Sequence, residues 1–324
     1  MRILLFFMWL LHWLPLPLLG RFGKLVGSML FIALRKRRRI ALTNLRLCLP
    51  ELDEAARVRL ARQHFQAYSR SVWERSILWW APQSRLRRLI EVVPAFPSAQ
   101  IASGPTILLC PHFVCLDVAG VATAMEISAS SMYVQQKNAA FDQVLRRGRS
   151  RFRPVRLFTR QDGIKPILRA LREGLPYFML PDMDFGPKDA EFVPFFGIPA
   201  ATLTATARIA AATGAQIMPV IATFLPHYQG WRVTYYPPWD DYPGPDMTAA
   251  TRRMNAFIEE RVREHPADYF WTHKRFKTRP PGQPSLYGAA TVTDAVTDSV
   301  TASATEPATA PDAPGRAGAG AAGD

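Results

Sequence analysis

Apolar runs of strand length alternate with amphipathic segments through the middle of the chain. Residues 106–110, 176–180 and 216–224 are short apolar runs that suit buried strands. The segment 51–80 instead places apolar residues on one helix face, at spacings of four, three and four: Ala61, Phe65, Tyr68 and Val72. Strands that alternate with helices in this way predict an α/β fold, with a mostly parallel central sheet flanked by helices.

The same pattern places the remaining elements, and no internal repeat is present. We expect strands at 106–110, 132–135, 155–159, 176–180, 216–224 and 231–236. We expect helices at 51–80, 114–126, 139–149, 164–173, 202–213 and 247–265. Gly174, Gly214 and Pro266 directly follow three of these helices and are typical helix stops.

The N-terminus carries two apolar stretches followed by a basic cluster. The first, 3–19, has 17 residues and would span about 25 Å as a helix, near the lower limit for crossing a bilayer. The second, 25–34, precedes the cluster RKRRR at 35–39. A cleaved signal peptide is disfavoured, because the cluster follows the apolar run and no small-residue cleavage site ends it. We therefore expect 1–34 to be a membrane anchor, either a span or a deeply embedded helix, with the rest of the chain on the cytoplasmic side.

The C-terminal segment, 289–324, has no aromatic residue and no apolar periodicity. We expect it to be a disordered tail, because it cannot bury enough surface to offset the entropy of ordering. It carries one cation and five acidic residues, a net charge of −4. The whole chain carries +14, so residues 1–288 carry +18, and 35–288 remain as the catalytic domain.

The excess of positive charge indicates anionic partners. Seven of the 40 cations are lysine and 33 are arginine, whose planar group suits phosphate and carboxylate. A genome that favours arginine codons explains this equally well. The segment 269–280 interleaves aromatic residues with cations that include Lys274 and Arg275, a pattern that suits single-stranded nucleic acid or phosphates beside a membrane. The N-terminal anchor favours the membrane, so we expect no nucleic-acid partner.

The three cysteines, Cys48, Cys110 and Cys115, are not spaced as a disulfide framework and favour a reducing compartment. With six scattered histidines they give no zinc-ligand spacing, so we expect no metal and no cofactor. The sequence also lacks a glycine-rich phosphate loop and a G-x-S-x-G nucleophile elbow.

One pair of residues can carry chemistry. His112 ends a predicted buried strand, and Asp117 follows five residues later. A histidine at a strand's carboxyl end can act as a general base, and a carboxylate can fix its tautomer. The spacing alone favours a plainer interpretation, in which Asp117 only complements a helix N-terminus.

A second predicted strand leads into a loop that we expect at the same edge of the sheet. This loop, 180–188, carries Asp182 and Asp184. The aromatic, turn-rich segment 191–197 follows and is either a wall for an acyl chain or part of the core.

These segments together resemble a known family. The sequence is similar to the late acyltransferases of lipid A biosynthesis, the lauroyl/myristoyl transferase family, within the glycerolipid acyltransferase superfamily and its His-x4-Asp/Glu motif. The matching segments occur in the family's order across 1–288: 39–51, the His112 motif, 158–160, 181–186, 193–197, 217–220 and 273–280. Asp117 departs from this branch, which often has glutamate at that position.

The resemblance implies an acyltransferase of the bacterial inner membrane, acting on its cytoplasmic face. The donor would be an acyl thioester on acyl carrier protein, and the acceptor a hydroxyl of a Kdo-bearing, phosphorylated lipid A precursor. His112 would take the acceptor's proton and Asp117 would orient His112, without an acyl-enzyme. Arg160 or backbone N–H groups would stabilise the oxyanion. By the same resemblance the substrate-binding residues would include Arg160, Asp182, Asp184, Lys274 and Arg275.

Other interpretations remain at this stage. Cys110 or Cys115 could form a covalent intermediate, and Arg160, Asp182 and Asp184 could form a structural ion-pair network. The acceptor could be another membrane lipid, such as a glycerophospholipid, an ornithine lipid or a glycosylated phosphoinositide. The chain could also be a membrane-tethered binder of nucleic acid or anionic lipid, for which His112, Asp117 and Arg160 would be dispensable.

Overall fold

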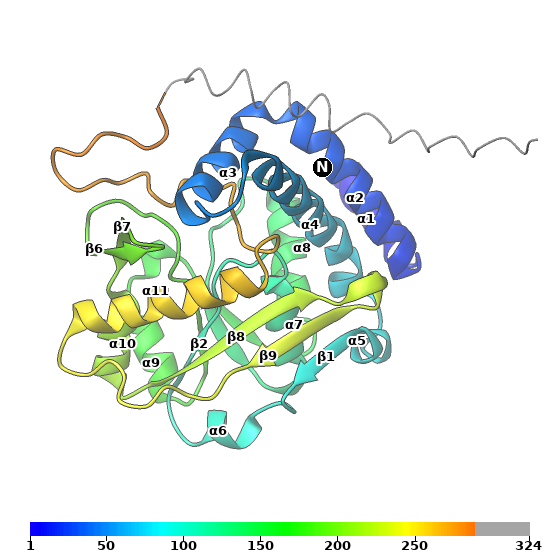
Figure 1. The fold of residues 1–324 in the computed structure, drawn as a ribbon. Coiled ribbons are helices and arrows are strands. Elements are labelled where there is room, and N and C mark those ends of the chain that lie inside the picture. The colour runs from blue at the N-terminus through cyan, green and yellow to red at the C-terminus, as the bar shows by residue number, and fades with distance from the viewer. Residues whose placement is uncertain (289–324) are drawn as a thin grey trace, which may run out of the picture. The chain divides into compact units, whose positions relative to one another are not determined.

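The computed structural model describes residues 1–288, which form one compact unit (Figure 1). The segment 289–324, predicted to be a disordered tail, lies outside the described residues. Residues 1–288 contain one seven-stranded sheet, one two-stranded hairpin and helices that surround them.

The central sheet has the strand order β1-β9-β8-β2-β5-β3-β4. Every neighbouring pair is parallel except β8 with β9, which is antiparallel. The predicted α/β fold with a mostly parallel sheet is therefore confirmed. The strands are β1 (Ile90–Val93), β2 (Thr106–Leu109), β3 (Ala129–Met132), β4 (Val155–Phe158), β5 (Tyr177–Met179), β8 (Gln216–Phe224) and β9 (Trp231–Tyr235), and the hairpin is β6 (Ala190–Phe195) with β7 (Ile198–Leu203).

Helices occupy most of the rest of the described chain, joined by short loops. Several ends follow from local sequence: Asp53 caps the long helix α4 by accepting a hydrogen bond from the Ala56 N–H, and Gly214 ends α10 in a left-handed conformation. The helices are α1 (Arg2–Leu11), α2 (Leu16–Ala33), α3 (Arg35–Cys48), α4 (Glu54–Trp80), α5 (Gln83–Leu89), α6 (Ser98–Ala102), α7 (Leu116–Glu126), α8 (Ala139–Arg149), α9 (Lys165–Arg172), α10 (Ala205–Thr213) and α11 (Met247–Glu264), with short 3-10 turns η1 (Arg160–Asp162) and η2 (Pro226–Tyr228).

The central strands are buried on both faces, as parallel strands usually are. All four residues of β2 are buried. Leu108, Phe178 and Met218 point to one side, where they join the core that α4 and α7 cover. The residues next to them along the strands, including Ile107 and Tyr177, point to the other side of the sheet, where α9 packs on β5. Loops at the carboxyl ends of β2, β3, β4 and β5 consequently meet at one edge of the sheet.

Three parts of the fold differ from the prediction. β3 covers Ala129–Met132 rather than 132–135, because its sequence ASSM is short and only weakly apolar. The hairpin β6–β7 occupies the segment before α10, so the helix predicted from residue 202 begins only at Ala205. β1, α5 and α6 were not expected, since each has seven or fewer residues and shows no clear period.

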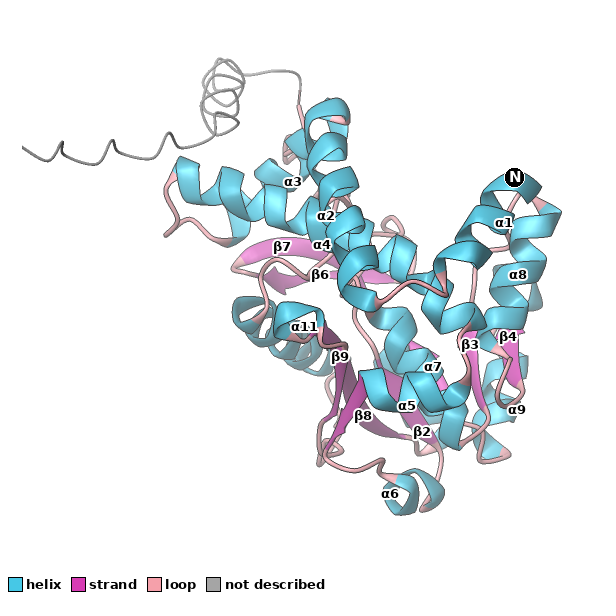
Figure 2. Cartoon of the chain, turned by 90° about the vertical axis from the view of Figure 1, so that its right-hand side faces the viewer, coloured by secondary structure: helices cyan, strands magenta, loops and turns pink. Residues whose placement is uncertain are grey.

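The N-terminal apolar segment forms two helices separated by residues 12–15, with Pro15 as the N-cap of α2 and Pro17 in its first turn (Figure 2). Within the described residues, α2 is the helix long and apolar enough to cross a membrane. α2 packs along α4 through glycines that allow very close approach. A Cβ at Gly27 would lie 2.5 Å from the Gln66 Cα, and one at Gly23 would lie 2.8 Å from the Arg70 Cα.

Candidate active site

His112 lies in the loop between β2 and α7, at the carboxyl end of a central strand. Backbone hydrogen bonds on either side hold this loop in place. The Cys110 N–H donates to the Met179 carbonyl (2.8 Å), and the His112 carbonyl accepts from the Phe270 N–H (3.0 Å). The His112 ring also stacks on the Phe270 ring, with centroids 6.4 Å apart. The ring keeps 19 % of its surface exposed, so a substrate can reach it.

Asp182, from the loop after β5, holds His112 at two points. Its Oδ1 lies 2.7 Å from the His112 Nδ1, and its Oδ2 accepts a hydrogen bond from the His112 backbone N–H (2.9 Å). The Asp182 carboxylate is almost fully buried, with 1 % of its side chain exposed. Burial raises the pKa of Asp182, but the attraction and hydrogen bonds of His112 outweigh burial and keep the pKa below its ordinary value.

An ionised carboxylate accepts hydrogen bonds only, so Asp182 selects the ring form that carries a proton on Nδ1. In the neutral ring of this form the other nitrogen, Nε2, carries no proton and can accept one. This is the arrangement that a histidine general base requires, with a buried carboxylate that fixes its tautomer.

Asp117 does not make the contact with His112 that the sequence led us to expect. Its Oδ2 lies 2.6 Å from the Arg75 Nε, and its Oδ1 lies 2.9 Å from the Arg149 Nη2. His112 precedes α7 and pairs with Asp182, whereas Asp117 lies in the first turn of α7 and pairs with the two arginines. Burial raises the pKa of Asp117, and the two guanidinium groups outweigh it and lower the pKa to about 2. Asp117 thus ties α7 to α4 and α8.

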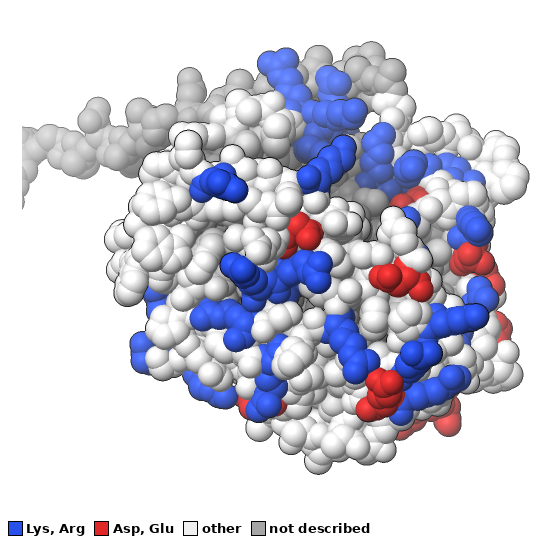
Figure 3. All heavy atoms as spheres, turned by 180° about the vertical axis from the view of Figure 1, so that it is seen from behind, with Lys and Arg blue, Asp and Glu red and all other residues white. Residues whose placement is uncertain are grey.

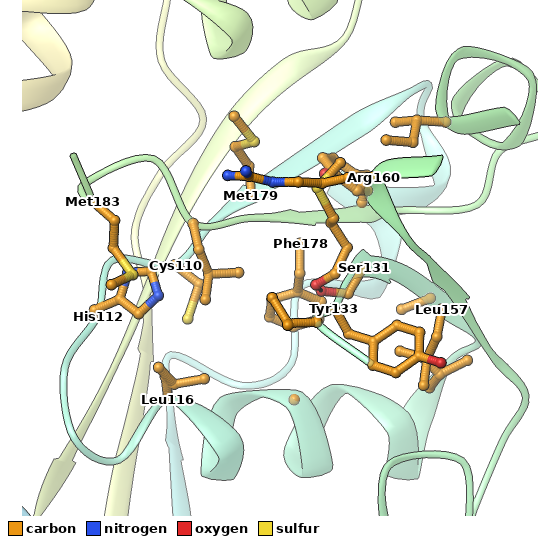
Figure 4. A pocket seen from close by; sticks show the side chains of 18 of the residues that line it. Cys110, His112, Leu116, Ser131, Tyr133, Leu157, Arg160, Phe178, Met179 and Met183 are labelled. Carbon is orange, nitrogen blue, oxygen red and sulfur yellow. Dashed lines mark hydrogen bonds between the residues drawn. The ribbon is translucent and has the colours of Figure 1, made fainter. Parts of the chain in front are cut away.

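A cavity of about 770 Å³ opens beside His112 and is lined mostly by apolar side chains. Figure 4 shows His112 and Met183 at one end and Tyr133 and Leu157 at the other. The lining comes from β3, β4 and β5 and from helices on both faces of the sheet, including α7, α8 and α9. Asp117 and Arg149 also line it, so their ion pair forms part of the cavity wall. An elongated apolar ligand fits such a space.

Arg160 lies in η1, at the carboxyl end of β4, and lines the same cavity as His112. Its guanidinium stacks over the Phe185 ring, with the central carbon 4.4 Å from the centroid. In the view of Figure 4 the side chain extends across the cavity toward the end that His112 occupies. Lys188 also lines the cavity, so two exposed cations, Arg160 and Lys188, accompany its apolar wall in addition to the ion-paired Arg149.

The other predicted substrate-binding residues lie outside the cavity lining. Arg275 is buried, and its guanidinium donates to the Ala201 carbonyl (2.8 Å) and the Thr202 Oγ1 (2.7 Å), so it supports strand β7. Lys274 is half-buried, and its ammonium lies 5.3 Å from the centroid of the Tyr287 ring.

Asp184 is also buried and joins two loops rather than facing the cavity. Its carboxylate accepts hydrogen bonds from Thr278 (N–H, 2.6 Å, and Oγ1, 2.7 Å) and from the Gly186 N–H (2.9 Å). Its own N–H donates to the His273 Nε2 (2.9 Å). Burial lowers the pKa of His273 to about 4, so the ring is neutral and can accept this hydrogen bond. Asp184 therefore fixes the 181–186 loop that carries Asp182.

The cysteines near the site are poor nucleophiles. Cys110 and Cys115 are each 2 % exposed, and burial raises the pKa of both thiols well above the ordinary value. A thiol in such surroundings stays protonated at neutral pH, which disfavours a covalent intermediate on sulfur. Within residues 1–288, no group of three or more His, Cys, Asp or Glu side chains is arranged to hold a metal ion.

The sequence of the chain matches the model of the bacterial lipid A biosynthesis acyltransferase family over residues 2–278. The chain belongs to this family. It is 30 % identical to the lipid A biosynthesis lauroyltransferase of Escherichia coli strain K12 over 283 residues, covering 86 % of this chain and 92 % of that protein. It is 31 % identical to the lipid A biosynthesis myristoyltransferase of the same organism over 274 residues, covering 84 % and 83 %. A lipid A biosynthesis acyltransferase of Haemophilus influenzae is 28 % identical over 281 residues, covering 85 % and 89 %.

Family membership establishes the general activity, because the matched residues include the whole His112 site and cavity. The protein is a lipid A acyltransferase, as the resemblance of its motifs indicated. Of the residues first considered, His112 and Asp182 lie in contact, and Arg160 and Asp117 line the adjoining cavity. Sequence reasoning missed Arg75 and Arg149 as partners of Asp117, although Arg149 ends a helix with an evident basic end.

Proposed function

We propose that this acyltransferase moves a fatty acyl chain from acyl carrier protein to a hydroxyl of a Kdo-bearing, phosphorylated lipid A precursor. The reaction takes place on the cytoplasmic face of the bacterial inner membrane. The observation that carries this proposal is the His112–Asp182 pair at one end of a large, mostly apolar cavity.

The reaction is a direct transfer. The His112 Nε2 takes the proton of the acceptor hydroxyl while its oxygen attacks the thioester carbonyl carbon. The resulting tetrahedral intermediate carries an oxyanion, which Arg160 and backbone N–H groups are suited to stabilise. When the intermediate collapses, the carbon–sulfur bond breaks and the thiolate takes the proton back from His112. Electrons and protons therefore balance without a cofactor or an acyl-enzyme.

Asp182 acts as the positioning residue for His112, the role first expected of Asp117. The buried carboxylate of Asp182 stabilises the imidazolium that forms when His112 accepts a proton. Asp117 instead fixes Arg149 and Arg75 at the cavity wall. We propose that the wall keeps the acyl chain aligned with His112.

The charge of the protein supports anionic substrates on both sides of the reaction. Figure 3 shows lysine and arginine side chains spread widely over one face, with few acidic side chains among them. An acidic carrier protein and a phosphorylated lipid are both attracted to such a surface. The apolar cavity suits the acyl chain that the donor brings.

An in vitro assay tests this proposal directly. Purified, detergent-solubilised protein is mixed with carrier proteins that bear acyl chains of graded length and with a Kdo-bearing lipid A precursor. We expect a product heavier by one acyl chain, and the chain length that reacts fastest defines the donor preference. His112→Ala should abolish the product, whereas the matched control His265→Ala, at the end of α11, should retain it.

Two other outcomes would redirect the proposal. If only glycerophospholipid or other lipid acceptors react, the acyl-transfer reaction is supported and the proposed lipid A precursor is not the acceptor. If no acceptor reacts and the thioester persists, the catalytic proposal fails, and binding of anionic lipid without catalysis becomes the better account.

A further inference from the structure

Helices α1 and α2 expose an unusual amount of apolar surface. Most of the large apolar side chains that are exposed among the described residues lie in the first 34 residues. On α2 they follow each other at spacings of four, three, four and three, which places them on one face of the helix. We call this surface the membrane face: Leu18, Phe22, Leu25, Met29 and Ile32 of α2 with the exposed apolar side chains of α1.

The opposite face of α2 is buried and packs against the rest of the protein. Gly20, Gly23 and Gly27 share this buried face, and the last two abut the α4 backbone. The Gln66 Nε2 donates a hydrogen bond to the Ser28 Oγ (2.9 Å), which adds a polar contact between the two helices. Helix α4 also carries several arginines, so it is unsuited to the hydrocarbon of a bilayer.

Both ends of α2 are attached to the same unit. At the N-terminal end, Arg85 of α5 donates hydrogen bonds to the carbonyls of His12 and Leu14 (2.6 Å for Leu14). At the C-terminal end, α3 follows at once, and the Asn44 Nδ2 donates to the Trp271 carbonyl (2.7 Å). A helix that crossed the bilayer would place these two ends about 27 Å apart along the membrane normal, with the first on the far side.

All the charged side chains of the first fifty residues are basic. The first acidic residue of the chain is Glu51, and the preceding fifty residues contain nine lysines and arginines. Arg21 and Lys24 are exposed on α2, with their charged groups 5.7 and 5.3 Å from the Tyr228 ring centroid. Arg35 and Lys36 are exposed where α2 ends. An apolar face bordered by cations complements a leaflet that carries anionic headgroups.

We propose that α1 and α2 lie in the near leaflet of an anionic bilayer, with α2 along the membrane plane rather than across it. The membrane face enters the acyl-chain boundary, the bordering cations meet the headgroups, and the glycine face stays on α4. The partner class, a lipid surface, rests on the membrane association proposed above, but the orientation is independent of the reaction.

The location of the N-terminus tests this orientation. A protease-cleavable epitope is placed before Met1 of the full chain, and inverted and right-side-out membrane vesicles are digested in parallel. A Ser84→Cys variant marks the side of the catalytic domain with a membrane-impermeant maleimide, because the three native cysteines are buried. We expect cleavage and labelling from the same side. Cleavage of the epitope from the opposite side would show that α2 crosses and would overturn the proposal.

The use of the membrane face is tested separately with the purified protein. We expect it to float with vesicles that contain phosphatidylglycerol, and to float less with pure phosphatidylcholine. The double variant Leu25→Glu/Met29→Glu should lose at least about tenfold in vesicle affinity, as should each single variant to a smaller extent, whereas the single variant Phe192→Glu, an exposed apolar residue changed on β6, should not. Unchanged binding by the double variant would overturn the assignment of this face.

Failure here and failure of the proposed reaction remain distinguishable. An epitope on the far side with normal acyl transfer removes only the orientation. An epitope on the near side without acyl transfer in the detergent assay removes only the reaction.

Discussion

His112 and Asp182 lie 70 residues apart in the chain and are joined by two hydrogen bonds, one from the ring and one from the backbone. The carboxylate that touches the reactive histidine therefore comes from the loop after the neighbouring strand β5 and not from the motif that contains His112.

Replacing Asp182 with Asn should lower kcat by about 10²–10⁴-fold with a much smaller change in KM. The amide keeps the shape but removes the charge that stabilises the imidazolium formed when His112 accepts the proton. Steady-state kinetics at saturating and at limiting substrate concentrations measure kcat and KM separately. Asp240→Asn, on an exposed turn, is the control, and an Asp182→Asn enzyme with wild-type kinetics would refute the positioning role.

Asp117→Asn should cost about 2 kcal/mol of unfolding free energy at neutral pH, because the folded pKa of about 2 lies below the ordinary 3.8. A lowered carboxyl pKa stabilises the fold above the unfolded pKa, and this stabilisation disappears as the pH falls from about 4 toward 2. Denaturant titrations at pH 7, 4 and 3 should show the difference from wild type shrinking with acidity. A difference that stays constant with pH would contradict the ion pairs with Arg75 and Arg149.

Two arginines that look alike in sequence should respond differently to replacement by Met. Arg160→Met should lower kcat/KM at least about tenfold while changing the unfolding free energy by less than about 0.5 kcal/mol, because Arg160 is exposed at the cavity. Arg275→Met should cost about 2–4 kcal/mol, because Ala201 and Thr202 lose a buried charged donor. Kinetics and denaturant titration of both variants measure the contrast. Equal effects on stability would show that their surroundings are misassigned.

Gly27→Ala should destabilise the protein by about 1–3 kcal/mol, because the new methyl group would press on the α4 backbone at Gln66. Alanine normally favours a helix over glycine, so the sign of the change separates packing from helix propensity. Gly120→Ala, inside α7, is the matched helical control, since nothing lies within 4 Å of a Cβ there. Thermal unfolding of both variants is the measurement, and a stabilised Gly27→Ala protein would exclude the close contact.

The central part of the fold could be predicted because its signals are local. β8 is apolar except for Gln216 and Thr223, and α8 has clear ends, so both were predicted with the bounds that the structure has. β3 could not be placed correctly, because ASSM becomes a strand only through pairing with β4 and β5. The β6–β7 hairpin likewise depends on its partner strand, and its prolines obscured it.

The site could be predicted as a set of residues but not as a set of contacts. His112 and the 180–188 loop were expected at one edge of the sheet, and the parallel pairing of β2 with β5 places them there. Which carboxylate meets His112 depends on side-chain direction, which spacing along the chain does not give. Arg275 was predicted to bind substrate because its neighbours are basic and aromatic, whereas its burial against Thr202 depends on tertiary packing.

Helix α8 contributes to two surfaces at once. Its residues Leu145 and Arg149 line the cavity, and α1 packs against the same helix. With α1 in the leaflet, lipid molecules that diffuse within the membrane come within about one helix diameter, some 10 Å, of the cavity wall. A lipid acceptor would then find the enzyme by a two-dimensional search, and neither it nor its heavier product would need to pass through water.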